Sequence, residues 1–453
     1  MNAASAAVRL ILRAAAIVAV LAAGARAADP AARPNIVFIL LDDLRWNALS
    51  CMGHPTARTP HIDRLAKEGA LFRNFFVTTP LCSPSRGSFL TGQYAHKHKV
   101  TTNGPKTDFS HQLVTFPLLL QRAGYTTAWV GKMHMGNDDS PRPGYDRWVS
   151  FKGQGEYENP EINVDGTSRK MEGYVTDILT QFAVDFVRTP HRQPFLLYLS
   201  HKAVHSPSIP APRHRELYAG AKIEFAPSLN ASRATKPALA KVSQYQVTEA
   251  GSLNHLRMLA AVVEGVGALL AALESTGQLD RTLVMFASDN GLFWGEHGLL
   301  SKRLAYEEAI RAPLLVRYPR LIKAGTVLDQ FALNIDVAPT LLELGGAAIP
   351  DTVQGRSLLP LFRSGSGSGA WRTSFLTEYF KETPNDRYPE WFAVRTARWK
   401  YIRHSGLPDA DELYDLAADP YEMKNLSTEP AAAAELRAAR LELDRLMITT
   451  GAK

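Results

Sequence analysis

Two strongly apolar stretches of the sequence each end in a pair of oxygen-bearing side chains. NIVFILLDD ends in Asp42 and Asp43, and TLVMFASDN ends in Asp289 and Asn290. Oxygen-only ligands of this kind suit a hard divalent cation, Ca²⁺ or Mg²⁺. One acidic strand end alone more often caps a turn or a helix, but two such ends at the same edge of a sheet favour a metal site.

Basic side chains follow other apolar stretches in the same way. Lys132 and His134 come after TTAWVG, His201 and His205 come after FLLYLS, and Lys302 follows the second acidic pair. A lone histidine in such a place is more often structural. Several cations around a metal, however, hold a tetrahedral oxyanion and stabilise the charge moved during its transfer. These residues therefore predict metal-assisted hydrolysis of a sulfate or phosphate ester.

The segment PLCSPSRG places a cysteine, Cys82, at a predicted helix N-terminus. Backbone N–H groups and the helix dipole favour anions there, so a thiolate would be a usable nucleophile. A soft thiolate beside a hard, oxygen-ligated cation is nevertheless a poor match, and an oxygen nucleophile would fit better. The chain has one other cysteine, Cys51, and a disulfide between the two is the alternative that the sequence leaves open.

These side chains need a common scaffold, and the hydrophobic pattern supplies one. Apolar stretches that predict buried strands alternate with helical patterns, of which VTFPLLLQRAG is one. This alternation predicts an α/β fold with a large, mainly parallel central sheet flanked by helices. Ligands bind beyond the carboxyl ends of such strands, so the polar ends should meet at one rim. The predicted strands lie at 35–43, 126–132, 195–201 and 282–290, and the helices begin at Thr59-Pro60 or cover 114–124 and 254–277.

The N-terminus predicts export. Arg9 and Arg13 precede an apolar run too short to span a bilayer, and Ala25-Arg26-Ala27 is an A-x-A cleavage signal. We therefore expect residues 1–27 to be a signal peptide and the mature chain to be periplasmic or secreted, without a membrane-spanning segment. The formal charge of +7 suits anionic partners, and export argues against nucleic acid among them.

The rest of the chain predicts one large domain and a small one. Residues 28–363 would form the catalytic domain, and SGSGSG (364–369) is typical of a flexible linker. Residues 370–453 would form a C-terminal α+β subdomain. Its predicted elements are antiparallel strands at 374–380 and 391–405 and a helix near 429–447.

The run from Cys82 to Arg86, CSPSR, followed by GSFLTG, resembles the signature of the type I sulfatases. Further blocks are similar to sulfatase segments in the family's usual order and cover essentially the whole mature chain. The resemblance implies an alkaline-phosphatase-like fold. It also implies that a maturase converts Cys82 to Cα-formylglycine, whose hydrate is the oxygen nucleophile. The blocks are NIVFILLDD, GYTTAWVGKMHMG, LSHKAVHSP, ASDNGLFWGEHGLLSKRLAYEEAIRAPLLVRYP and DELYDLAADPYEMKNL.

Residue roles follow from the same resemblance. Lys132 and Lys302 would bind the sulfate oxygens, and Arg86 would stabilise the formylglycine hydrate. His134 would take a proton from the second hydroxyl of the sulfated intermediate. His205 would contact sulfate and protonate the leaving oxygen, with His201 as the competing candidate. The implied Ca²⁺ ligands, for which Mg²⁺ is possible, are Asp42, Asp43, Asp289, Asn290 and the modified Cys82.

The substrate is predicted from two further stretches, residues 142–166 and HKAVHSPSIPAPRH. Both look similar to bacterial N-acetylglucosamine-6-sulfatase-like enzymes, which favours exo-acting removal of 6-O-sulfate from a hexosamine in glycosaminoglycans or mucin-type glycans. Trp148 and Tyr157 could line the sugar pocket, although such aromatic residues are more often packing residues. The other candidates for that pocket are Gln154, His297 and the irregular loop 225–250.

Other functions stay open on the sequence alone. One is another glycan or choline sulfatase. A second is a phosphomonoesterase, phosphodiesterase or phosphonate hydrolase of the same superfamily, against which Cys82 argues because such relatives usually carry Ser or Thr. A third is an inactive glycan-binding protein, against which the complete set of catalytic positions argues.

Overall fold

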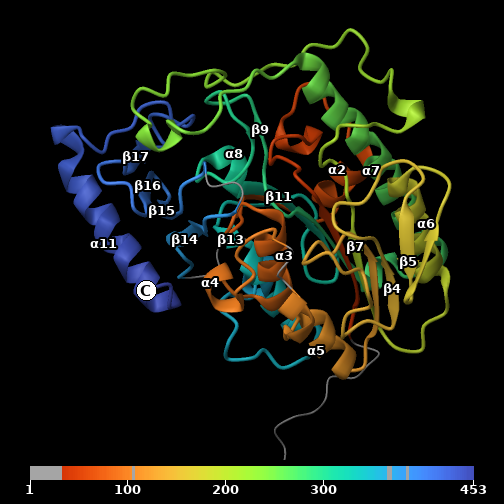
Figure 1. Cartoon of the computed structure of the whole chain (residues 1–453). Helices are drawn as coiled ribbons and strands as arrows, with labels where there is room; N and C mark the ends of the chain where they lie inside the picture. Colours follow the sequence, from red (N-terminus) through yellow and green to blue (C-terminus); the bar gives the residue numbers. More distant parts are fainter. Residues whose placement is uncertain (1–32, 105–107, 365–369, 384–386) are drawn as a thin grey trace, which may run out of the picture. The chain divides into compact units, whose positions relative to one another are not determined.

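The computed structural model describes residues 33–453 except 105–107, 365–369 and 384–386 (Figure 1). The predicted signal peptide lies outside the described residues, as do residues 365–369 of the predicted linker. Residues 34–453 form one compact unit.

The centre of that unit is a parallel sheet. β1 (Asn35–Leu41) lies between β7 (Phe195–Ser200) and β8 (Thr282–Ser288), and β3 (Thr126–Gly131) pairs with β7. All three pairings are parallel, so the carboxyl ends of the four strands share one edge. The predicted α/β fold and its parallel centre are confirmed.

The outer strands make the sheet mixed. β11 (Arg311–Arg317) runs antiparallel to both of its neighbours, and an antiparallel hairpin forms the other end. The strand order is β12-β2-β11-β8-β1-β7-β3-β4-β5-β6, with β13 beside β2. The remaining strands of this sheet are β2 (Ala70–Phe76), β4 (Arg147–Ser150), β5 (Glu161–Val164), β6 (Thr167–Lys170), β12 (Thr326–Leu328) and β13 (Ala332–Leu333). A separate two-stranded ladder joins β9 (Phe293–Trp294) and β10 (Leu300–Ser301).

Helices cover both faces of the sheet, which explains the continuous apolar run in β1. Val37, Ile39 and Leu41 pack into one apolar cluster with α2, α6 and α7. Phe38 and Leu40 pack into another with α3, α5, α9 and α10. A strand buried on both faces reads as an unbroken apolar stretch. The helices are α2 (Pro60–Lys67), α3 (Cys82–Thr91), α4 (Ala95–His98), α5 (Phe116–Arg122), α6 (Val175–Arg188), α7 (Glu249–Ser275), α8 (Glu307–Ile310), α9 (Val337–Gly345) and α10 (Leu359–Ser364).

By length and composition alone, α7 is apolar enough to cross a membrane, which the sequence interpretation overlooked. Among the described residues, α7 is the one helix long and apolar enough by this measure. Of its most apolar window, 67% is buried inside the protein. Its apolar side chains belong to the cluster under the sheet. A core helix of a large α/β protein accounts for this pattern.

The C-terminal region forms a four-stranded antiparallel sheet backed by one helix. Its elements are β14 (Ser374–Tyr379), β15 (Trp391–Thr396), β16 (Trp399–His404), β17 (Glu412–Asp415) and α11 (Ala433–Thr450). The prediction of one strand over 391–405 is wrong, because the chain turns at 397–398 and pairs with itself. Ala397 and Arg398 are not typical turn formers, so the hairpin reads as one strand.

Candidate active site

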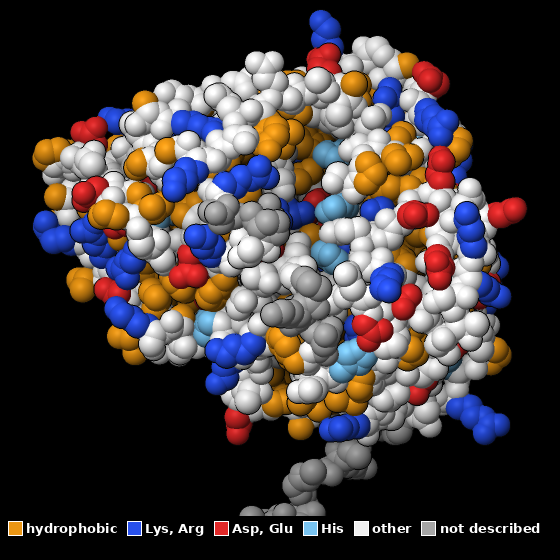
Figure 2. All heavy atoms as spheres, in the orientation of Figure 1, with side chains coloured by type: hydrophobic (Ala, Val, Ile, Leu, Met, Phe, Trp, Pro, Cys, Tyr) orange, Lys and Arg blue, Asp and Glu red, His pale blue; other side chains and the backbone are white. Residues whose placement is uncertain are grey.

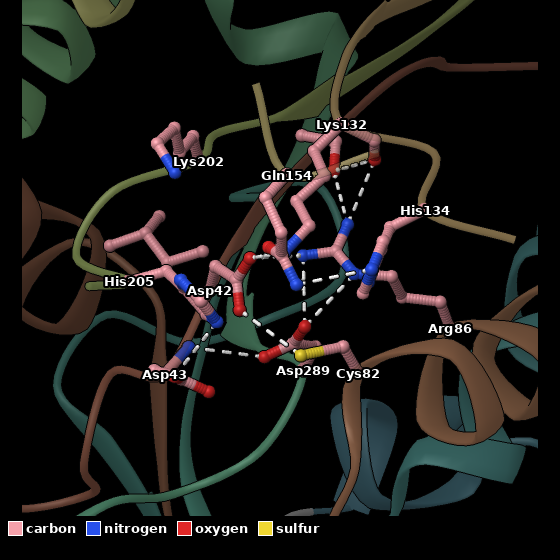
Figure 3. A network of polar contacts seen from close by, with 12 residues as sticks. Asp42, Asp43, Cys82, Arg86, Lys132, His134, Gln154, Lys202, His205 and Asp289 are labelled. Atoms are coloured by element: carbon pink, nitrogen blue, oxygen red, sulfur yellow. Dashed lines mark hydrogen bonds and ion pairs between the residues drawn. The ribbon is translucent and has the colours of Figure 1, made fainter. Parts of the chain in front are cut away.

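The two acidic strand ends meet beyond the carboxyl edge of the sheet. Asp42 and Asp43 follow β1, and Asp289 follows β8, its parallel neighbour. Carboxylate oxygens of these three residues lie within 4.8 Å of one another (Figure 3). The Asp43 backbone N–H also donates to Asp289 Oδ1 at 3.1 Å, which fixes one strand end against the other.

This cluster fits a divalent cation. Asn290 Nδ2 donates to Asp43 Oδ1 at 2.6 Å, whereas Asn290 Oδ1 is buried and has no hydrogen-bond partner among the described residues. Burial and the charge of Asp42 raise the pKa of Asp289 to about 7. A hard cation would satisfy the orphaned amide oxygen and offset this like-charge repulsion.

Cys82 is the first residue of α3, as predicted, and its side chain is buried. Its Sγ donates to Asp42 Oδ1 at 3.5 Å. Burial and the Asp42 carboxylate raise the pKa of the thiol to about 12, which opposes the thiolate that the helix N-terminus would favour. Both Cys82 and Cys51 are free, so the structure does not contain the alternative disulfide.

Arg86 lies one turn along α3 and joins that helix to the acidic cluster. Its guanidinium contacts Asp289 Oδ2 at 2.9 Å through Nε and Nη2, and Nη1 donates to the Lys132 carbonyl at 2.9 Å. The side chain is fully buried. Arg86 therefore fixes the position of Cys82 relative to the carboxylates and keeps a positive charge beneath them.

Two lysine ammonium groups contact the carboxylates from other elements. Lys132, after β3, donates to Asp42 and to Gln154 Oε1. Lys302 donates to both carboxylate oxygens of Asp43 at 2.6 Å. Burial disfavours charge on Lys302, but Asp43 more than compensates, and the pKa of Lys302 is raised.

Two histidines complete the inner ring of the site. His134 Nε2 lies 3.1 Å from Gln154 Nε2, so it accepts from that amide; burial and Lys132 hold the pKa of His134 well below its usual value. His205 Nδ1 lies 2.7 Å from the Ser206 carbonyl, and Nε2 lies 3.6 Å from Asp43 Oδ2. Burial lowers the pKa of His205 to about 4. Both rings are therefore neutral near pH 7.

A cavity of about 560 Å³ opens beside this cluster of carboxylates, lysines and histidines. Figure 2 shows a hollow in the middle of this face with histidine side chains inside it. Four of the residues predicted at the site, Asp43, His205, Gln154 and Lys302, line the cavity, and the end of the loop 225–250 contributes Gln246. The lining residues that the sequence interpretation missed include Asn103, His255, Trp294 and Arg303. Asn103 and His255 lie outside the quoted motifs, whereas Trp294 and Arg303 lie in the block ASDNGLFWGEHGLLSKRLAYEEAIRAPLLVRYP, which gave them no role.

Four predicted pocket residues lie elsewhere. His201 and His297 do not line the cavity; both are buried, and neither ring nitrogen of either has a partner among the described residues. Trp148 stacks on Trp129, as a packing residue does. Tyr157 donates to the His205 carbonyl, so it supports the histidine and not a sugar. The substrate-binding role predicted for His201 and His297 is therefore not supported by their positions, and the geometry favours His205.

Comparison with known proteins settles the family. A family model described as Sulfatase matches residues 34–347, and one described as N-sulphoglucosamine sulphohydrolase, C-terminal, matches residues 295–448. The chain belongs to the sulfatase family. It is accordingly a sulfuric ester hydrolase, as the resemblance implied.

Two proteins similar to this sulfatase are described by the amino sugars on which they act. N-acetylglucosamine-6-O-sulfatase of Bacteroides thetaiotaomicron is 31% identical, over 87% of this chain and 82% of that protein. A structure described as a complex with its substrate D-glucosamine-2-N,6-O-disulfate is 30% identical, with a TM-score of 0.84 over 93% of this chain and 99% of that one. Phosphonate monoester hydrolase of Agrobacterium radiobacter shares the fold, with a TM-score of 0.78 over 92% of this chain and 96% of that one at 22% identity.

Proposed function

We propose that this sulfatase removes 6-O-sulfate from N-acetylglucosamine or a related hexosamine in a sulfated glycan. The observation that carries the proposal is the contact between Cys82 Sγ and Asp42 within a carboxylate cluster that Lys132 and Lys302 also contact. The names of the relatives support the sugar and the position of the sulfate.

We propose that Cys82 is converted by a maturase to Cα-formylglycine and that Asp42, Asp43, Asp289 and Asn290 hold Ca²⁺, or Mg²⁺. The hydrated aldehyde supplies an oxygen nucleophile with a second hydroxyl for release of sulfate, which a raised-pKa thiol does not. The cation supplies charge stabilisation for the sulfate oxygens and lowers the pKa of an oxygen bound to it.

The remaining residues bind the sulfate and move protons. The ammonium groups of Lys132 and Lys302 neutralise the sulfate oxygens and the charge that develops on them. His134 is neutral, and its Nε2 accepts from Gln154, so it can take a proton when the sulfate leaves.

The contacts of His205 support a role in protonating the leaving alcohol. Because its Nδ1 faces the Ser206 carbonyl, its Nε2 is the nitrogen that faces Asp43 and the cavity. Its lowered pKa means that the ring must gain a proton to act as an acid. The negative charge of a bound sulfate ester raises the pKa of a nearby imidazole, so substrate binding would supply the missing protonation.

The test is release of inorganic sulfate from N-acetylglucosamine 6-sulfate by protein made with a formylglycine maturase and Ca²⁺. We expect multiple turnovers by the wild type. Cys82→Ser should lose turnover by about three orders of magnitude or more, because a serine lacks the second hydroxyl. Normal turnover by that variant would refute the formylglycine proposal.

Two further measurements separate the alternatives. If no sulfate is released although the mass of the Cys82 peptide shows the aldehyde, the sugar is wrong and other sulfated glycans and choline sulfate come next. A higher kcat/KM for the matched phosphate ester than for the sulfate would favour a phosphorus-ester hydrolase instead.

We also propose that the protein is exported to the periplasm or secreted after removal of residues 1–27. The charged and apolar pattern before Ala28 supports this proposal. N-terminal sequencing of the protein from the extracytoplasmic fraction should begin near Ala28, and a full-length chain in the cytoplasm would contradict it.

A further inference from the structure

Arg303 stands at the cavity wall beside Lys302 and is absent from the chemistry proposed above. Its Nε donates to Glu382 Oε2 at 2.6 Å, and its Nη1 lies 3.3 Å from Ser301 Oγ. The guanidinium also lies over the ring of Tyr388, 5.7 Å from its centroid. It also hydrogen-bonds with the Tyr379 hydroxyl. A guanidinium has five N–H donors, so these three contacts still leave donors for a ligand.

Glu382, which follows β14, anchors this corner of the cavity. Besides Arg303, its carboxylate accepts from the Asn103 backbone N–H at 3.1 Å and from the Tyr379 hydroxyl at 3.0 Å. Asn103 lines the cavity, and its side-chain oxygen accepts at 2.9 Å from the backbone N–H of Ser83, the residue directly after Cys82. The buried Glu382 therefore connects the C-terminal sheet to two cavity-lining residues, the Arg303 side chain and the Asn103 backbone, and through Asn103 to the first turn of α3.

The charges around the cavity favour a substrate with more than one anionic group. Asp43 is the one carboxylate among the described residues that line it, and it belongs to the acidic cluster. Lys302 is already paired with Asp43 and, in the proposed function, binds the scissile sulfate. Arg303 lies next to it in the chain but is anchored from the other side, by Glu382, so it adds a second cation to the wall.

We propose that Arg303, oriented by Glu382, forms a second anion subsite that binds a further sulfate or carboxylate of the sugar substrate. A planar guanidinium recognises such a group through two parallel N–H bonds. The subsite rests on the proposed function, because it deepens the substrate class from a 6-sulfated hexosamine to one that carries another negative charge.

The test compares kcat/KM for glucosamine 2-N,6-O-disulfate and for N-acetylglucosamine 3,6-O-disulfate with that for N-acetylglucosamine 6-sulfate. We expect the wild type to prefer at least one disulfate by about tenfold or more. In Arg303→Gln the kcat/KM values for the disulfate and the monosulfate should differ by no more than about twofold. Glu382→Gln should lower the preference by a smaller factor, because Arg303 keeps its charge but loses its anchor.

Two control variants separate a binding role from a structural one. Arg303→Lys keeps the charge without the planar fork and should give an intermediate preference. Arg192→Gln removes an exposed arginine before β7, at the opposite edge of the sheet, and should leave the preference unchanged. Thermal unfolding of each variant shows whether it is folded.

Binding to Cys82→Ser protein, measured by calorimetry, gives the same ratio without turnover. If no substrate is hydrolysed, the proposed function fails, whereas the ratio of Kd values still decides the subsite. Equal affinity of the three sugars, or a preference that persists in Arg303→Gln, would overturn the second anion subsite.

Discussion

Three carboxylates lie close together beyond the carboxyl ends of β1 and β8. The free energy of that arrangement depends on which positive charges neutralise them. The pKa of Asp289 is raised by burial and by Asp42, although Arg86 contacts it directly. An Asp289 carboxylate that also binds a cation escapes this penalty.

Asp289→Ala should therefore lose bound Ca²⁺ and reduce kcat/KM by about 10²-fold or more. Elemental analysis of the purified protein and sulfate release measure the two effects. Asp280→Ala, an exposed aspartate that precedes β8 and pairs with Arg317, is the control and should keep both. Retained metal in Asp289→Ala would show that the cation is held elsewhere.

The second prediction concerns the Gln154 side chain, which hydrogen-bonds to both Lys132 and His134. Gln154→Glu places a carboxylate where an anionic substrate must enter. We expect KM to rise by about tenfold or more, and the effect to shrink at high salt if it is screened repulsion. An unchanged KM at low ionic strength would place the sulfate away from this residue.

At the scale of elements, α3 positions both Cys82 and Arg86. The close packing of α3 against its neighbours depends on Gly87. A Cβ at Gly87 would lie 2.8 Å from His98 Cε1. The His98 ring cannot easily yield, because Ser88 and the Val100 backbone bond its two nitrogens.

Gly87→Ala should therefore shift α3, lower the free energy of unfolding by about 1–3 kcal/mol and reduce kcat/KM by about tenfold. Urea unfolding and sulfate release measure the two effects. Because the clash is with His98, the effects of Gly87→Ala and His98→Ala should not add in the double variant. Additive effects would mean that α3 does not rest on this ring.

The C-terminal helix is held by a histidine whose charge depends on pH. His96 Nδ1 lies 2.8 Å from Glu378 Oε2 and Nε2 lies 2.8 Å from the Thr450 carbonyl, near the end of α11. Burial opposes the charge on His96, but Glu378 outweighs it and raises the pKa. The stabilisation is complete below the unfolded-state pKa of about 6.5 and is lost as the pH rises through the folded-state pKa.

His96→Gln should consequently cost about 1–3 kcal/mol of unfolding free energy at pH 5.5 and less at pH 9. Urea titrations of wild type and variant at both pH values give the difference directly. A cost that is the same at both would mean that the neutral ring provides the contact.

The elements differ in how far the sequence predicted them. The strands before Asp42, Lys132, His201 and Asp289 were predicted, because strands buried on both faces read as apolar runs and parallel strands share an edge. The cavity wall was predicted only in part. Gln154 and the loop 225–250 were candidates, whereas Asn103 lies outside any motif and Trp294 and Arg303 lie in a sulfatase-like block that gave them no role. The choice between His201 and His205 needed coordinates, since three residues of turn decide which ring faces the cavity.

At the scale of the molecule, we expect the two parts predicted on either side of residues 364–369 to depend on each other for stability. The C-terminal sheet shares one apolar cluster with Phe76, Leu81 and Phe293 of the larger part. Tyr306 donates to Glu412, and Trp391 donates to the Arg303 carbonyl. Each apolar side chain exposed by removing that sheet costs roughly 1.5–3 kcal/mol, against a total stability of about 5–15 kcal/mol.

We therefore expect calorimetry of residues 28–453 to show one cooperative transition. The fragment 28–363 should show none, because its part of the cluster would face water. Circular dichroism of the fragment measures the same loss. A fragment that unfolds cooperatively and releases sulfate would establish two autonomous domains instead.

The complete burial of Cys82 also constrains the order of events during biogenesis. The Cys82 side chain has no exposed surface, and Cys82 is already part of helix α3 as its first residue. A second enzyme that oxidises this cysteine needs it in an extended, accessible peptide. If the conversion occurs as we propose, it precedes the docking of α3, so maturation competes in time with folding. A chain that folds before it meets its maturase would remain permanently in the thiol form, and the active fraction of a preparation would reflect a race between two rates.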